Sequence, residues 1–315
     1  MSAYLTRRML GFAVNLVFVS IFVFTLLRLV PGDAAANILG QDASPENLEK
    51  FREAHGLNGS FLEQYTRWAG GMLQGDFGKS LWSHTSVTST FFSRLPITLE
   101  IVALSFSFTL LFGISSGIIS ALKQNSWTDM GVRLVAIFGL AVPNFLILTL
   151  LLIIPSRYFG YAPPFGATNP FDNPLDNLRL FVPPTLLLSI SSSAVLMRFT
   201  RSGFLEVLRQ DYIRTARSKG LHERVVTMRH ALRNALPPVL TLAGLQLGGL
   251  LSGSIILERV MGLPGLGGWT LDAIQNKDTP VVMLVSLYTA IVLMTINLVI
   301  DLTYALIDPR IRVNA

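Results

Sequence analysis

The chain has 315 residues, of which 51% are hydrophobic and only 14% are charged, and its mean hydropathy is positive. A charged share well below the ~25% of soluble domains indicates an integral membrane protein. The net charge of +6 comes from basic residues beside apolar segments, which favours membrane lipid over nucleic acid as their neighbour. The absence of cysteine excludes disulfides, thiolate metal sites and cysteine nucleophiles.

Six segments are apolar over about the 20 residues that a membrane-spanning helix needs. We therefore predict an all-α integral membrane protein with spans at residues 9–30, 97–122, 132–154, 180–197, 236–257 and 281–300. The first segment is longer than the ~7–15 apolar residues of a secretion signal, so we expect it to remain uncleaved. Pro183, Pro184 and the serines of residues 189–193 make the fourth span short and polar.

Basic residues predict the orientation of the spans, because short loops rich in Lys and Arg stay in the cytoplasm. Arg7 and Arg8 precede the first span, Lys123 and Arg133 lie in the second connection, and Arg310 and Arg312 follow the last span. Residues 198–235 are also rich in basic residues. We call residues 198–235 the basic loop. The pattern predicts a multi-pass protein of the cell membrane with cytoplasmic termini (1–8 at the start), an extracytoplasmic segment at 31–96 and a membrane core at 97–315.

The extracytoplasmic segment carries a helix signal. Ser44 is placed as an N-cap, Pro45 stands in the first turn and Gly56 provides a stop. The segment is poor in apolar residues, so we expect it to be helical and to pack on the outer surface rather than fold alone.

The middle of the basic loop has the composition of a docking helix. It reads Asp211-Tyr212-Ile213-Arg214-Thr215-Ala216-Arg217-Ser218-Lys219-Gly220-Leu221. The small side chains of Thr215 and Ala216 would let another backbone approach, and Gly220 supplies the left-handed turn that ends a helix.

This loop resembles that of the permease subunits of binding-protein-dependent ABC importers, in particular the peptide branch. Their pattern is Glu-Ala-Ala, three residues, Gly, nine residues, then Ile-x-Leu-Pro. Gly220, Ala216 and Leu232 match it, whereas Arg214, Thr215, His230 and Arg233 depart from it. Residues 211–221 and 230–235 are nonetheless similar to the peptide-permease version almost residue for residue. Residues 4–8, 31–33, 75–78, 264–267 and 308–312 carry the same resemblance.

The resemblance implies a type I importer fold and a set of partners. Two cytoplasmic ABC ATPases would bind ATP and Mg²⁺, a second homologous permease would complete a heterodimer, and an extracytoplasmic binding protein would dock near residues 31–96 and deliver di- or oligopeptides. Nickel, glutathione and haem are alternative cargoes. The ATPase-coupling residues would be Asp211, Tyr212, Arg214, Thr215, Ala216, Arg217, Lys219, Gly220 and Leu221, and an outer gate would include Pro264, Gly265 and Gly267.

Two short motifs resemble catalytic patterns without meeting their requirements. Gly78-Lys79-Ser80 lacks the first glycine of a phosphate-binding loop, because position 73 is leucine. Gly113-Ile114-Ser115-Ser116-Gly117 matches the hydrolase pattern G-x-S-x-G, but all four histidines fall in predicted loops, away from this serine. We expect these glycines, like those of 244–253, to let helices approach closely, and we expect no enzyme activity in this chain.

Polar residues inside the spans are candidates for a translocation path, since a peptide needs hydrogen-bond partners there. We select Asn144, Ser189, Ser193 and Gln246. A secondary transporter or a channel is the rival class. Its signs would be inverted repeats, broken helices and charges at the bilayer midplane, and Pro183-Pro184 is the one hint of these.

Overall fold

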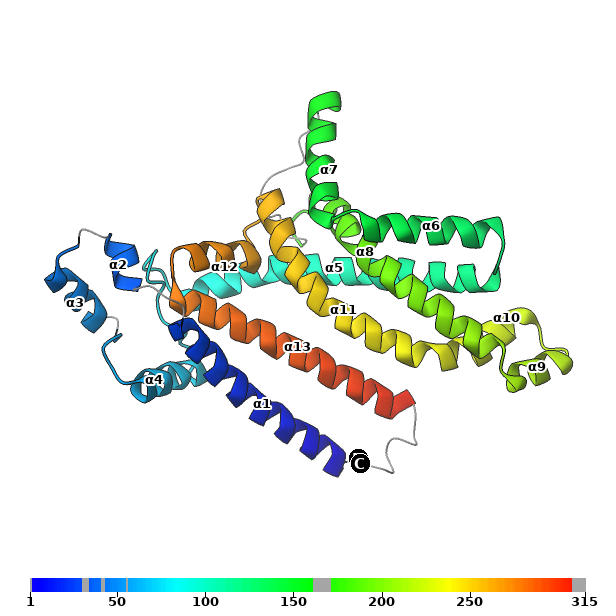
Figure 1. Ribbon diagram of the computed structural model, residues 1–315, viewed down its shortest axis with the longest axis horizontal. Coiled ribbons are helices and arrows are strands. Elements are labelled where there is room, and N and C mark those ends of the chain that lie inside the picture. The colour runs from blue at the N-terminus through cyan, green and yellow to red at the C-terminus, as the bar shows by residue number, and fades with distance from the viewer. Residues whose placement is uncertain (1, 30–33, 41–42, 55, 161–170, 308–315) are drawn as a thin grey trace. The chain divides into compact units, whose positions relative to one another are not determined.

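The computed structural model describes residues 2–29, 34–40, 43–54, 56–160 and 171–307, and the regular structure in these ranges is helical apart from an isolated bridge between Lys79 and Ser86. This confirms the predicted all-α class. Figure 1 shows the order of the helices along the chain, which is α1 (Ser2–Leu29), α2 (Ala34–Leu39), α3 (Pro45–Ala54), α4 (Phe61–Leu73), α5 (Val87–Leu122), α6 (Trp127–Ala141), α7 (Asn144–Phe159), α8 (Pro174–Leu208), α9 (Asp211–Ser218), α10 (Glu223–Val225), the π-helix η1 (Val226–Ala231), α11 (Leu232–Met261), α12 (Leu266–Gln275) and α13 (Thr279–Ile307).

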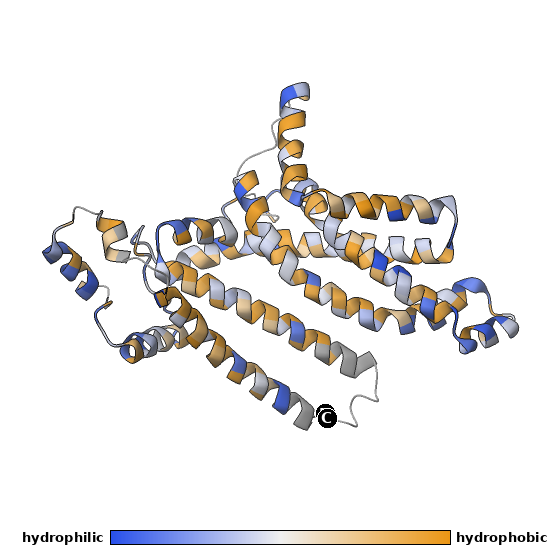
Figure 2. Ribbon diagram, viewed as in Figure 1, coloured by the Kyte–Doolittle hydropathy of each residue, from blue (hydrophilic) through white to orange (hydrophobic). Residues whose placement is uncertain are grey.

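Among the described residues, five helices are long and apolar enough to cross a membrane, and a sixth crossing results if the bent pair α6 and α7 counts as one span. The five lie in α1, α5, α8, the α10 to α11 segment and α13. Apolar residues run along these helices in Figure 2, while the α9 and α10 region is hydrophilic. The chain is thus a multi-pass membrane protein.

The predicted third span, residues 132–154, does not form one helix. Helix α6 ends at Ala141, α7 begins at Asn144, and the two are bent by 91°. Pro143 causes the break, because its ring excludes the preceding residue from the helical region, and Val142 accordingly adopts an extended backbone with φ −94° and ψ 124°. A broken helix, which we had named as a sign of the rival class, is therefore present at Val142 and Pro143.

The predicted fourth span, residues 180–197, is also longer than expected. It forms the middle of α8, which continues through Pro183 and Pro184. Neighbouring helices allow prolines inside a membrane helix by packing around the disturbed turn. Phe181, Pro184 and Thr185 are all buried, and the Thr185 hydroxyl donates to Phe181 O at 2.6 Å.

The chain forms two compact units, and each is described by itself. Residues Met1–Pro96 and Pro264–Thr295 form unit 1, whereas Ile97–Leu263 and Ile296–Ala315 form unit 2. The boundary at residue 97 coincides with the predicted start of the membrane core, but residues 264–295, which we had placed in that core, belong to unit 1.

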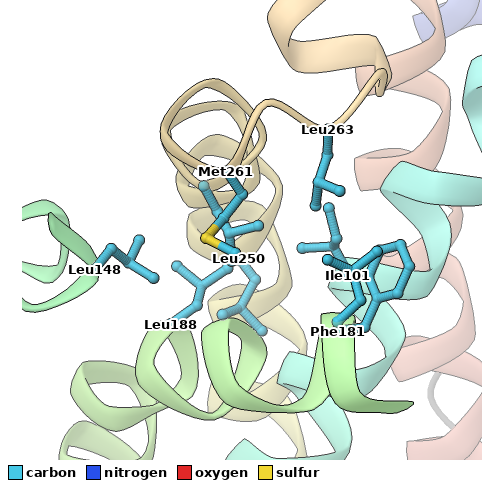
Figure 3. Close-up of a cluster of buried hydrophobic side chains, with 9 residues drawn as sticks. Ile101, Leu148, Phe181, Leu188, Leu250, Met261 and Leu263 are labelled. Carbon is cyan, nitrogen blue, oxygen red and sulfur yellow. The ribbon is translucent and has the colours of Figure 1, made fainter. Parts of the chain in front are cut away.

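The core of unit 2 lies where α5, α7, α8 and the end of α11 meet. Figure 3 shows its buried side chains, which are Ile101, Leu148, Leu180, Phe181, Leu188, Leu250, Leu257, Met261 and Leu263. Glycines let these helices approach. A Cβ at Gly117 of α5 would lie 2.6 Å from Thr200 Cβ of α8, and a Cβ at Gly139 of α6 would lie 2.7 Å from Ile190 of α8. The G-x-S-x-G glycines therefore serve helix packing within the chain.

Unit 1 has a core between the start of α5, α12 and the first part of α13, formed by Val87, Phe91, Leu266, Ala273, Val281, Val282, Leu284 and Val285. The carboxylate of Asp278 accepts from Ser80 Oγ and, at 3.0 Å, from Leu81 N, which ties the segment before α5 to the start of α13. The predicted helix start is confirmed, since Ser44 Oγ accepts from Asn47 N and α3 begins at Pro45. Gly56 has φ +64°, as the predicted stop requires.

Candidate functional site

The basic loop is a chain of short helices between two long ones. Helix α8 ends at Leu208, α9 follows at Asp211–Ser218, and α10 and η1 lead into α11 (Figure 1). Gly220 has φ +76°, a left-handed conformation that a side chain would strain, so the predicted turn after α9 is confirmed. Two short connections therefore set α9 between the ends of α8 and α10.

One face of α9 anchors the helix to the rest of unit 2. Ile213 and Ala216, three residues apart on this face, are buried. They join a cluster that we call the loop core, formed by Ala121, Phe204, Ile213, Ala216, Val226, Ala231 and Ala235. Because these residues come from α5, α8, α9, η1 and α11, the position of α9 is coupled to the ends of three long helices.

The other face of α9 is exposed. Asp211, Tyr212, Arg214, Thr215 and Arg217 all lie on it, and Lys219, Gly220 and Leu221 continue the exposed surface. The surface is cationic because Arg214, Arg217 and Lys219 are exposed on it. It also has apolar points, since Tyr212 and Leu221 remain 42% and 39% exposed. A helix that packs on its own chain through one face and exposes such a surface on the other is suited to bind another protein.

Two contacts hold side chains of this exposed surface. Asn234 Nδ2 donates to Tyr212 Oη at 2.8 Å, which links α9 to the start of α11. Arg217 makes two hydrogen bonds with Glu223, from Nε to Oε2 at 3.1 Å and from Nη2 to Oε1 at 2.6 Å. This pairing raises the pKa of Arg217 above its ordinary value, and it fixes the position of a guanidinium that is charged at any physiological pH.

Ala216 differs from its expected role. We had assigned its small side chain to close approach by another protein, but it is 7% exposed and lies in the loop core. Its size instead lets α9 pack closely on its own chain. Of the coupling residues predicted from sequence, Ala216 is the one that does not lie on the exposed surface.

The π-helix η1 was not predicted. Six residues, Val226–Ala231, take a wider turn between α10 and α11, and Met228 is 55% exposed there. Such turns occur often at functional sites, but no residue pattern in a single sequence marks them. His230, which we had placed in a loop, lies within η1.

The candidate path residues lie around the middle of α8. Ser191 Oγ lies 2.7 Å from Asn144 Oδ1 and 2.8 Å from Gly139 O, and Gln246 Nε2 donates to Ser192 O at 3.5 Å. Asn144 and Gln246 therefore approach the same part of α8 from α7 and α11. Ser191 was missed as an individual candidate, although it belongs to the serine run.

The two selected serines behave differently from Asn144 and Gln246. Ser189 is buried and donates to Leu186 O of its own helix at 2.7 Å. The Ser193 hydroxyl is buried without a hydrogen-bond partner among the described residues. A path lined by all four residues thus stays a prediction.

The predicted outer-gate residues lie at the start of α12 in unit 1. Gly265 is the N-cap of this helix and Gly267 is buried inside it. Arg94 Nη1 donates to Gly265 O at 3.4 Å, and the guanidinium carbon lies 5.6 Å from the centre of the Trp269 ring. The turn at Pro264 is thus held by a cation from α5, and its role as a gate stays a prediction.

The fold and this loop define a class of protein, a multi-pass helical membrane protein that displays a short cationic helix between two spans. The chain belongs to the family described as binding-protein-dependent transport system inner membrane component, whose model matches residues 113–313. The model of the N-terminal part of these membrane components matches residues 1–102. The family predicted from the sequence is confirmed, and the chain is the permease component of such a transport system.

Relatives match over nearly the whole chain. The glutathione transport system permease protein GsiC of Escherichia coli (strain K12) is 38% identical over 309 residues, which cover 98% of each chain. A Brucella suis protein provisionally named as a peptide transport system permease is 38% identical over 312 residues, or 99% of each chain. Among solved structures, the inward-facing MetNI methionine ABC transporter matches with a TM-score of 0.56 and 17% identity, covering 69% of this chain and 96% of that chain. This likeness confirms the importer permease fold.

Proposed function

We propose that this permease carries short peptides into the cell, powered by ATP hydrolysis in two cytoplasmic ATPase subunits that hold ATP and Mg²⁺. A second homologous permease completes the membrane part, and an extracytoplasmic binding protein delivers the substrate. Support comes from the permease family and from relatives whose names specify peptide or glutathione transport. Glutathione is itself a small peptide, so both names indicate one chemical class.

The exposed surface of α9 carries the mechanistic part of the proposal. Ile213 and Ala216 pack in the loop core and so fix the position of α9, while Arg214 and Thr215 are exposed. We assign this surface to the ATPase, which places the basic loop and both termini in the cytoplasm. ATP-driven closure of the ATPases would then push α9, and the loop core would pass the displacement to α5, α8 and α11. This chain would perform no catalysis itself.

Charge reversal on α9 tests this assignment. Arg214 and its ion-pair partner Asp211 are both exposed, so we expect Arg214→Glu to change the stability of the fold little while it places a carboxylate on the proposed contact surface. Losing one favourable charge and adding a repulsive one costs several kcal/mol at a protein interface. We expect ATP-dependent uptake of labelled di- or tripeptide by the reconstituted complex to fall by roughly tenfold or more, because each 1.4 kcal/mol is tenfold.

Arg157→Glu is the matched control, because Arg157 is exposed at the last turn of α7, away from the basic loop. It should retain uptake. Equal uptake by both variants would contradict the α9 assignment, and uptake of neither dipeptides, tripeptides nor glutathione by the wild-type complex would contradict the peptide class.

A further inference from the structure

Next to the loop core lies a buried carboxylate that the proposed function has not used. Asp129, in the first turn of α6, has no exposed surface. Arg201 of α8 donates to it twice, from Nε to Oδ1 and from Nη2 to Oδ2, both at 2.9 Å. Ser120 Oγ of α5 also donates to Oδ1, and Asn125 N donates to Oδ2 at 3.0 Å. One carboxylate thus joins α5, α6 and α8.

This contact adjoins the loop core on two of the three helices. Ser120 directly precedes Ala121, and Arg201 lies three residues before Phe204, and both Ala121 and Phe204 belong to the loop core. Arg201 also donates from Nε to Ser120 Oγ at 3.0 Å, so α5 and α8 are linked directly as well. The ends of α5 and α8 that receive α9 are therefore the same ends that hold Asp129.

Helix α6 leads from this contact to the candidate path. It packs along α8 through Ala136, against Ala194 and Met197, and through Gly139 against Ile190. It then ends at the break, where Ser191 lies within hydrogen-bond distance of Gly139 O and Asn144 Oδ1. A connected series of contacts thus runs from α9 to Val142 and Pro143.

The chemistry of the contact suits a positioning role better than mere adhesion. A buried ion pair is weak as a source of stability, because desolvation offsets most of the attraction, and apolar residues hold helices together at least as well. What a two-pronged guanidinium–carboxylate contact adds is direction, since both hydrogen bonds form in a single orientation of the two planes. The pair therefore fixes how α6 is rotated and placed against α8.

We propose that Asp129 and Arg201 are positioning residues that lock the adjoining ends of α5, α6 and α8 into one rigid block, so that a displacement of α9 moves α6 and the break at Val142–Pro143 together with α8. This inference rests on the proposed function for the direction of the transmitted motion. The rigidity of the block is a separate claim and can be measured without transport.

The transport test uses the reconstituted complex and compares Asp129→Asn with Arg133→Gln. Asparagine keeps the shape of aspartate but removes its charge. Arg133 also pairs with this carboxylate, from Nε to Asp129 Oδ1 at 3.6 Å, but its side chain is 50% exposed. Arg133→Gln therefore removes a nearby cation, keeps the two-pronged contact with Arg201, and serves as the control. For Asp129→Asn we expect ATP hydrolysis to continue while peptide uptake per ATP falls by roughly tenfold, within the range for residues that carry coupling. Arg133→Gln should keep the wild-type ratio.

The rigidity test uses the absence of native cysteine. Spin labels at Trp127→Cys and Ser218→Cys, both exposed positions outside the proposed coupling residues, report the distance between α6 and α9. In the wild-type background this distance should be the same with and without bound nucleotide, because both sites belong to one block. In the Asp129→Asn background the distribution of distances between the two labels should broaden, or its mean should change when nucleotide binds.

An assembled Asp129→Asn complex with a wild-type uptake-to-ATP ratio and an unchanged label distance would overturn the inference. If Asp129→Asn does not assemble, Arg201→Lys, which keeps the charge but loses the two-pronged contact, replaces it. Failure of both to assemble would make the pair a folding element only and would also overturn the inference. A wild-type complex without ATP-driven uptake would reject the proposed function, while the label distances would still decide the rigidity of the block.

Discussion

At the scale of single residues, Gly220 and Ala216 set the position of α9 in different ways, one through a left-handed turn after the helix and the other through packing on the loop core. Gly220 was recognised because a left-handed turn has a residue signature, and the turn is present with φ +76°. Ala216 was recognised through the family pattern but given the wrong surroundings. A small residue fits equally well against a partner or against its own chain, and only the packing of α9 on the loop core distinguishes the two.

The burial of Ala216 gives a prediction about stability. Ala216→Arg places a long charged side chain in the loop core, where overpacking alone costs about 1–3 kcal/mol and an unpaired buried charge adds to it. We expect a lower thermal unfolding midpoint and a lower yield of assembled complex. Ser218→Arg, at an exposed position of α9 outside the proposed coupling residues, should behave like the wild type in the same thermal measurement. Equal midpoints for the two variants would show that Ala216 is not packed as described.

At the scale of elements, the predicted spans correspond to helices because about 20 apolar residues have few alternatives in a membrane. Their breaks were harder to predict. Pro143 ends α6, whereas Pro155, Pro183, Pro184, Pro237 and Pro238 lie within continuous helices. Proline disturbs the preceding turn at each position, and at Pro183 and Pro184 the packing of neighbouring helices accommodates the disturbed turn. The π-helix η1 was missed because no residue pattern in a single sequence marks such a turn.

Helix α8 contacts the α6–α7 break through Ser191. Gly139 O belongs to the last turn of α6, where carbonyls lack partners within the helix, and Ser191 Oγ lies 2.8 Å from it. We therefore expect Ser191→Ala to lower the free energy of unfolding by about 1–3 kcal/mol, the cost of an unsatisfied buried acceptor.

Ser189→Ala is the control, because Ser189 donates only within its own helix, to Leu186 O. Its effect on thermal unfolding of the purified complex should be smaller. An equal or greater effect of Ser189→Ala would argue that the break does not depend on α8.

At the scale of the whole molecule, composition and loop charge were sufficient for the membrane class, and the basic loop together with residues 4–8, 31–33, 75–78, 264–267 and 308–312 was sufficient for the family. The division into units was only partly accessible. Residues 264–295 join the N-terminal part through side-chain packing of Leu266, Ala273 and Val281 on Val87 and Phe91, which no local pattern encodes. The Asp129–Arg201 pair was missed similarly, since its members are far apart in sequence and ordinary in type.

We propose that the exposed surface of α9 binds the ATPase, and this contact can be measured directly. The most direct measurement attaches a photoreactive maleimide to Thr215→Cys in the assembled transporter, where the chain offers no other cysteine. Mass spectrometry then identifies what the irradiated label has captured, with Arg157→Cys as the control. The account predicts an adduct between residue 215 and an ATPase subunit that is absent at residue 157. Capture of lipid or of the extracytoplasmic binding protein at residue 215, with no ATPase adduct, would contradict it.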